Sequence, residues 1–138
     1  AASGDDAVHK KFFSLLQKAG FEVVVPGALD GLCCGMIFDS RGFRATGADQ
    51  AKAMQEALLE ASERGRVPIV CDTSPCLQRM KEKFDSPLLK LAMYEPVQFI
   101  SLYLQKELEF SKVRESVAVH ETIQNMKVNN NSCWATFL

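Results

Sequence analysis

Apolar residues recur at helical spacing near the start of the chain, and a short β-branched run follows them. The recurring positions are Val8, Phe12, Leu15, Leu16 and Ala19. They predict a helix over residues 6–19, which Gly20 ends. The next run, residues 21–26, is rich in valine and closes on Pro26, which predicts a strand.

The middle of the chain repeats this alternation. Small and apolar residues predict a helix over 47–64, and their size allows close packing on a sheet. The continuous apolar run 67–72 predicts a strand that is covered on both faces. Ser74 and Pro75 then predict the start of a third helix, with Ser74 as the cap and Pro75 at the first helical position.

The pattern is less clear in the last third of the chain. Residues 88–94 are ambiguous, and we interpret them as a candidate third strand. Glu95 and Pro96 start a fourth predicted helix, residues 116–120 form a further predicted strand, and residues 121–127 resemble a helix start.

Alternation of helices and strands at these lengths predicts an α/β fold, with a parallel sheet of about four strands flanked by helices on both faces. A length of 138 residues suits one domain. Functional sites in such sheets gather beyond the carboxyl ends of the strands. We therefore expect Cys33 and Cys34, Cys76, and His120 to meet at one edge of the sheet.

Composition excludes several classes of function. The formal net charge is −1 and no basic stripe exists, which argues against nucleic-acid binding. No apolar run approaches ~18 residues, so we expect no transmembrane segment. The first residues lack the basic and apolar regions of a signal peptide. Five cysteines, an odd number, favour a reducing intracellular compartment, cytoplasmic or mitochondrial.

The cysteines carry the candidate chemistry. Adjacent Cys33 and Cys34 rarely bond each other, because a disulfide needs a wider Cα separation. With Cys71 and Cys76 arriving from another segment, they suggest soft-metal or iron–sulfur ligation. The simpler interpretation is that they are small buried apolar residues, above all Cys71 inside a strand. Cys76 lies near a predicted helix start, where the helix dipole favours a thiolate.

Other polar residues give weaker signals. His120 is more often a structural hydrogen bonder than a ligand, and Cys133 has no evident role. Arg41 and Arg44 follow the cysteine pair. Three roles are open to them: they belong to a solvated loop, they balance thiolate charge, or they bind an anion. The glycines lack the dinucleotide-binding spacing, and no nucleophile–base–orienter set is present, so we name no catalytic residue.

Taken together, three runs resemble a known family. They are GFEVVVP at 20–26, CCG at 33–35 and IVCDTSPC at 69–76. Their order and spacing resemble the cysteine-rich CCG domain of heterodisulfide reductases and glycolate oxidases, and most of all the carboxyl-terminal iron–sulfur region of FAD-linked D-lactate dehydrogenases. The runs YEPVQF at 94–99 and VAVH at 117–120 are similar to that region too. The resemblance spans about residues 8–126.

The resemblance implies that the chain is one CCG-type domain, residues 1–138, of a longer oxidoreductase. It implies an iron–sulfur cluster with Cys33, Cys34 and Cys76 as ligands and Cys71 as a fourth candidate. A flavin-containing domain or subunit, with FAD, would deliver electrons from a 2-hydroxy acid. A quinone, cytochrome or second subunit would accept them. The chain alone would not oxidise a substrate.

The chain departs from the family pattern at three positions. No cysteine precedes Cys33, Thr73 stands where the first cysteine of a Cys-x-x-Cys motif is expected, and no cysteine occurs near Thr122. Three or four thiolates remain, against four for a typical cluster. Two alternatives therefore stay open. One is a degenerate module that serves as a docking or homodimerisation domain, and the other is a structural zinc–thiolate site.

Overall fold

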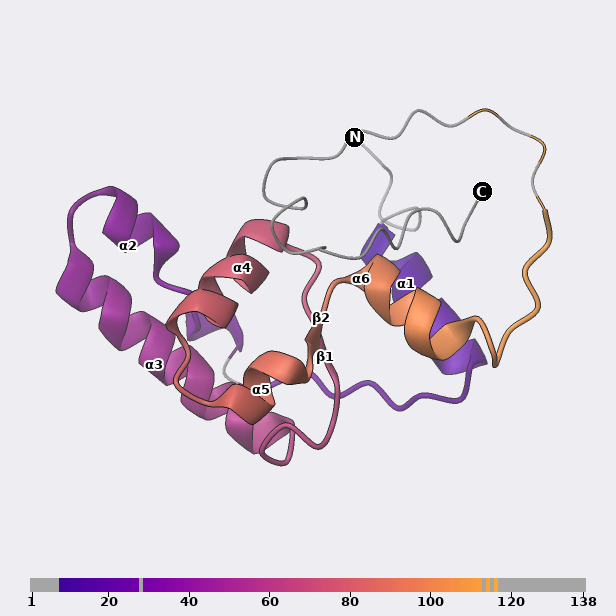
Figure 1. Ribbon diagram of the computed structural model, residues 1–138, viewed down its shortest axis with the longest axis horizontal. Helices are drawn as coiled ribbons and strands as arrows, with labels where there is room; N and C mark the ends of the chain where they lie inside the picture. The colour runs from indigo at the N-terminus through magenta and orange to yellow at the C-terminus, as the bar shows by residue number, and fades with distance from the viewer. Residues whose placement is uncertain (1–7, 28, 113, 115, 117–138) are drawn as a thin grey trace.

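The computed structural model describes residues 8–27, 29–112, 114 and 116 (Figure 1). Within them the protein is mostly helical, with six α-helices and one small parallel sheet of two strands. The helices are α1 (Val8–Lys18), α2 (Met36–Ser40), α3 (Arg44–Ala61), α4 (Ser74–Lys83), α5 (Pro87–Leu91) and α6 (Pro96–Phe99). The strands are β1 (Ile69–Val70) and β2 (Met93–Tyr94). A 3-10 turn (Leu29–Gly31) precedes α2, and a π-helical segment (Ile100–Leu104) continues α6.

The two strands lie side by side at the centre, between two groups of helices (Figure 1). Ile69 pairs with Met93, and Val70 pairs with Tyr94. Successive residues of a strand face opposite sides of a sheet. Ile69 and Met93 accordingly belong to one core cluster, while Val70 and Tyr94 pack against another. Both faces of the sheet are therefore covered by apolar side chains.

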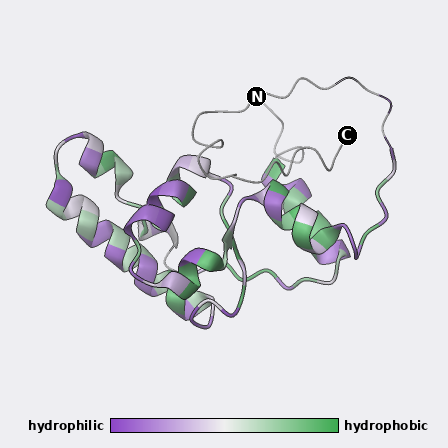
Figure 2. Ribbon diagram, viewed as in Figure 1, coloured by the Kyte–Doolittle hydropathy of each residue, from purple (hydrophilic) through white to green (hydrophobic). Residues whose placement is uncertain are grey.

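The first core cluster lies among α3, α4 and α5. Its buried members are Cys34, Leu58, Leu77, Met80, Phe84, Leu89 and Met93. Hydrophobic and hydrophilic residues alternate along these helices (Figure 2), so each presents an apolar side to this cluster and a polar side to solvent. One of the four candidate ligand cysteines, Cys34, is thus a full member of the core.

The second core cluster joins the beginning of the chain to its later part. Its buried members are Leu16, Phe99 and Leu104, from α1, α6 and the π-helical segment. Phe99 contacts the Phe21 ring edge-on, with centroids 5.6 Å apart, and stacks on Tyr103 at 4.7 Å. Together with Leu16, these contacts hold α1 and the segment after it against α6, on the far side of the sheet from α3.

The parallel arrangement and the mixture of helix and strand are confirmed, but the sheet in the described part of the chain has two strands and not about four. Residues 21–26 have no regular secondary structure and form no strand, because no described strand lies alongside to supply hydrogen bonds. Phe21 and Val23 still pack against the second core cluster, whereas Val24 is 64% exposed. The valine-rich run indicated β propensity and partial burial, neither of which requires strand pairing.

Residues 88–94 also differ from the prediction, which was a third strand. Most of this segment belongs to α5, and only Met93 and Tyr94 form a strand. Ser86 caps α5 by accepting a hydrogen bond from the Leu89 N–H at 3.3 Å, and Pro87 occupies its first turn. This is the Ser-Pro signal that correctly predicted α4, where Thr73 rather than Ser74 takes the cap position.

The remaining sequence predictions concern helix ends, membrane spans and the last part of the chain. Gly20 follows α1 in a left-handed conformation, as the predicted helix stop required. The helix predicted over 47–64 instead runs from Arg44 to Ala61, so Gly65, also left-handed, lies beyond its end. No helix in the described part of the chain is long and apolar enough to cross a membrane. His120, Cys133, the predicted strand 116–120 beyond residue 116, and the helix start at 121–127 lie outside the described residues.

Candidate functional site

The thiols of Cys34 and Cys76 meet although the residues are far apart in sequence. Cys34 lies in the loop before α2, and Cys76 lies in the first turn of α4. Their Sγ atoms are 3.2 Å apart. Cys34 is 4% exposed, and Cys76 packs against the same core cluster. The sequence prediction that the two segments converge is therefore confirmed for these residues.

The loop that carries Cys34 is fixed by a backbone contact between two glycines. Gly35 has φ +81, a conformation that L side chains rarely adopt. A Cβ atom at Gly35 would overlap the carbonyl oxygen of Gly47 in α3 and stand 2.9 Å from its carbonyl carbon. Glycine at both positions lets the loop lie directly on α3, which sets the direction of the neighbouring Cys34 side chain.

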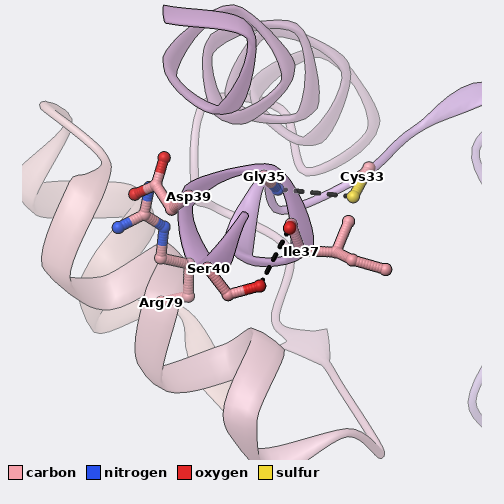
Figure 3. A network of polar contacts seen from close by, with 6 residues as sticks. All are labelled: Cys33, Gly35, Ile37, Asp39, Ser40 and Arg79. Carbon is pink, nitrogen blue, oxygen red and sulfur yellow. Dashed lines mark hydrogen bonds and ion pairs between the residues drawn. The ribbon is translucent and has the colours of Figure 1, made fainter. Parts of the chain in front are cut away.

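Cys33 and Cys71 lie around this pair. The Cys33 Sγ accepts a hydrogen bond from the Gly35 N–H at 3.4 Å, which turns the side chain back along its own loop (Figure 3). Cys71 follows β1, and its N–H donates to the Tyr94 carbonyl at 3.0 Å, so the ladder extends by one bond. Its thiol donates to the Thr73 carbonyl at 3.6 Å. Cys71 packs against the first core cluster, as its strand position predicted.

Burial and the neighbouring thiol hold Cys76 in its protonated form. Desolvation raises the pKa of Cys76 to about 12, and the hydrogen bond with Cys34 and the nearby charges of Cys34, Cys71 and Cys33 add to the rise. The expectation that the start of α4 favours a Cys76 thiolate is thus wrong. The apolar surroundings and a neighbouring thiol outweigh the helix dipole.

Cys71 behaves in the same way. Burial raises the pKa of its thiol, and the negative charges of Asp72, Cys34 and Glu95 act in the same direction. A thiol held protonated is a poor nucleophile at neutral pH. A bound metal ion reverses this, because coordination displaces the thiol protons. Cys71 and Cys76 are therefore poor nucleophiles as they stand and are chemically compatible with metal binding.

The residue types at the site suit a thiophilic metal group, but their arrangement suits one less well. Two thiolates that share one tetrahedral ion at about 2.3 Å lie roughly 3.8 Å apart. The Cys34–Cys76 separation of 3.2 Å is somewhat shorter than this value, so the two sulfur atoms would move apart slightly to share an ion. In the described part of the chain, however, no three His, Cys, Asp or Glu side chains are gathered closely enough to hold an ion as they stand. Cys33 and Cys71 would have to turn toward the pair.

Two polar features next to the thiols were missed in the sequence. Glu95 is 5% exposed, and its Oε1 has no hydrogen-bond partner among the residues that the structure describes. The charge of Glu95 acts on both Cys71 and Lys81. Burial lowers the pKa of Lys81. In the sequence, Glu95 was recognised only as part of the Glu95-Pro96 helix start, and nothing there indicates that its side chain is buried.

The second missed feature is an ion pair between Asp39 of α2 and Arg79 of α4. The Asp39 carboxylate binds the Arg79 guanidinium across the gap between the two helices (Figure 3). The side chains are 28% and 12% exposed. This pair ties the helix that follows Cys34 to the helix that carries Cys76, so it supports the thiol site from one side.

Comparisons with known proteins add nothing to this geometry. No protein-family model, no curated protein and no solved structure matches the chain.

Proposed function

We propose that this chain is the electron-transfer portion of a FAD-linked D-lactate dehydrogenase-like oxidoreductase. In this proposal Cys33, Cys34 and Cys76, with Cys71 as the fourth residue, hold an iron–sulfur cluster. The observation that carries the proposal is the 3.2 Å separation of the Cys34 and Cys76 thiols, which come from two segments that the CCG resemblance independently names as ligand-bearing.

Three further features support a thiolate site. The charges of Cys33, Cys34 and Cys71 all act on Cys76, which supports Cys33 and Cys71 as the residues that would turn toward the pair. Adjacent apolar residues of the first core cluster exclude water, which strengthens electrostatic interactions with a bound group. Gly35 and Gly47 fix the loop backbone, and a preorganised loop reduces the entropy lost on binding.

The proposal assigns the remaining parts of the reaction to other molecules or domains. A bound cluster would supply one-electron transfer, while the cysteines of this chain would hold and orient it. FAD would lie in a separate domain or subunit, since the glycines here lack a dinucleotide-binding pattern. An electron acceptor would complete the path in a reducing intracellular compartment. The alternation of helices and strands in the sequence predicts a sheet of about four strands, of which the described residues contain two.

Anaerobic reconstitution tests the proposal. The reduced protein would be incubated with ferrous iron and sulfide, desalted, and examined by visible absorbance, iron and sulfide analysis, and electron paramagnetic resonance after reduction. The expected result is a broad thiolate-to-iron absorbance with iron and sulfide in equal amounts. Cys34→Ser and Cys76→Ser should abolish it, because each removes one member of the central pair.

Cys133→Ser is the matched control, since it removes a cysteine that the proposal does not use. It should reconstitute like the unsubstituted protein. If Cys133→Ser loses as much iron as Cys34→Ser, the assignment of ligands is wrong. If neither iron nor sulfide is retained by the folded, reduced protein, the electron-transfer proposal fails, and the docking or homodimerisation module becomes the better explanation.

A structural zinc site is a second candidate, favoured by one specific observation. The Cys34–Cys76 separation needs only a slight increase to match that of two thiolates on one tetrahedral ion. Zinc titration of the apoprotein, followed by thermal unfolding, separates this candidate from the first. One tightly bound zinc ion, a raised unfolding temperature and no sulfide-dependent absorbance would identify a structural rather than a redox site.

A further inference from the structure

A cavity of about 730 Å³ lies between α2, α3 and α4, away from the four thiols. None of the cysteines lines it, so it is separate from the candidate metal centre. Apolar side chains, among them Met36, Ala51 and Phe84, form part of its wall. Its volume is in the range of small-molecule binding sites, which is about 300–1,000 Å³.

Two rows of basic residues line this cavity. Arg44 and Lys52 lie on α3 eight positions apart with Ala48 between them, so all three share one helix face. Arg79 and Lys83 lie four positions apart on α4. Like charges at this spacing destabilise a helix slightly, and an anion between the rows would remove that penalty.

The negative charge at the cavity does not neutralise these residues. Asp39 and Asp85 are the acidic residues that line it, against four basic ones. Asp39 is already paired with Arg79. Among the residues that the structure describes, Arg44, Lys52 and Lys83 make no ion pair with any acidic side chain. The cavity therefore carries an excess of positive charge that is free to meet a ligand.

The Arg79 guanidinium is held in place rather than left mobile. It is mostly buried, and Asp39 fixes its position (Figure 3). Its Nε has no hydrogen-bond partner in the described part of the chain. A positioned guanidinium beside flexible lysines is the usual arrangement for binding carboxylate or phosphate groups, since arginine supplies geometry and lysine supplies charge.

We propose that this cavity binds a small organic anion with at least two negative charges, borne on phosphate or carboxylate groups. Arg44, Lys52 and Lys83 would contact the charged groups, and the apolar wall would contact the body of the molecule. Recognition would be separate from any metal at the cysteines, so the proposal stands whether or not a cluster is present.

Titration with two defined probes tests this site. Pyrophosphate and citrate would each be added to the isotope-labelled, reduced protein at low salt, and amide shifts in two-dimensional NMR spectra would be followed alongside calorimetry. Saturable shifts are expected for residues 36–55 and 79–85. A preference for pyrophosphate assigns phosphate as the recognised group, and a preference for citrate assigns carboxylate; either supports the site.

Paired lysine variants provide the control. Lys52→Ala with Lys83→Ala should weaken binding by about tenfold or more, because two charged contacts are lost. Lys18→Ala with Lys90→Ala removes the same charge from positions that do not line the cavity and should leave binding unchanged. Equal weakening by both pairs, in folded protein, would show non-specific charge attraction and overturn the proposal, as would the absence of saturable binding by either probe.

Discussion

Gly35 lies with its backbone against the backbone of Gly47, so that neither residue has space for a side chain. A Cβ at Gly35 would overlap the Gly47 carbonyl oxygen, and a Cβ at Gly47 would overlap a carboxylate oxygen of Asp39 and lie 3.0 Å from the Gly35 carbonyl oxygen. This contact explains why glycine follows the cysteine pair. It lets the Cys34 loop reach the core beside α3.

Gly35→Ala should therefore destabilise the protein strongly. Left-handed strain and overpacking against a helix backbone together cost about 2–4 kcal/mol. Gly42→Ala is the matched control, because Gly42 also has a positive φ (+88) but has nothing within 4 Å of its Cβ position. It should lose only about 1–2 kcal/mol, the strain alone. Urea denaturation measures both, and equal losses would show that the Gly47 contact is unimportant.

The sequence predicted α1, α3, α4 and α6 because helical spacing and helix starts are local signals, but it missed α2 and indicated a strand where α5 lies. The meeting of the α4 cysteine with the Cys34 loop followed instead from the expected parallel topology. The extent of the sheet could not be predicted in this way. Whether a β-branched run such as 21–26 becomes a strand depends on a neighbour for its hydrogen bonds, and periodicity records only which side is buried.

The two tyrosines of the chain provide a direct spectroscopic test of the second core cluster. The hydroxyl groups of Tyr94 and Tyr103 are 3.1 Å apart, and this hydrogen bond is the main reason that the pKa of Tyr94 is raised to about 12. Tyr103→Phe removes the hydrogen-bond partner and should bring the pKa of Tyr94 down toward its ordinary value of 10.0. Ultraviolet titration at the tyrosinate band measures the change.

The interpretation is simple because the chain contains only two tyrosines. In the unsubstituted protein one of them should ionise late. Tyr94→Phe is the companion control, since its spectrum then reports Tyr103 alone. If the late step survives in Tyr103→Phe, some group other than the Tyr103 hydroxyl raises the pKa of Tyr94.

The candidate site was only partly predictable for a related reason. Cysteine positions along the chain identify potential ligands, but their ionisation depends on burial, which the sequence does not reveal. Cys76 looked activated by a helix start, yet its apolar surroundings raise its pKa. Asp39 and Arg79 lie 40 positions apart, and no local pattern indicates that they meet.

The Asp39–Arg79 pair should contribute measurably to stability. Asp39→Asn keeps the side-chain shape but leaves a mostly buried guanidinium without its counter-charge, which should cost about 1–3 kcal/mol. Glu63→Gln is the control, because the pair of Glu63 with Arg66 is exposed and spans 3.6 Å. Its loss should change stability by less than about 1 kcal/mol. Similar losses in denaturant titrations would mean that the buried pair has no special role.

The raised pKa of Cys76 makes stability depend on pH in the alkaline range. The thiol ionises near pH 9.0 in the unfolded chain and near pH 12 in the folded protein. Below pH 9.0 both states hold the proton, and the contribution to stability is complete. Above it the unfolded state alone releases the proton, so stability falls as pH rises toward about 12.

Comparison with Cys76→Ser isolates this effect from the other groups that titrate there. Urea unfolding in the presence of a reductant should give the same difference in stability between the two proteins at any pH below 9.0. Within the window above it, the unsubstituted protein should lose stability faster than Cys76→Ser, because only the former carries the thiol. Cys133→Ser should follow the unsubstituted protein throughout. A difference that stays constant across the window would mean that Cys76 is not desolvated in the folded state.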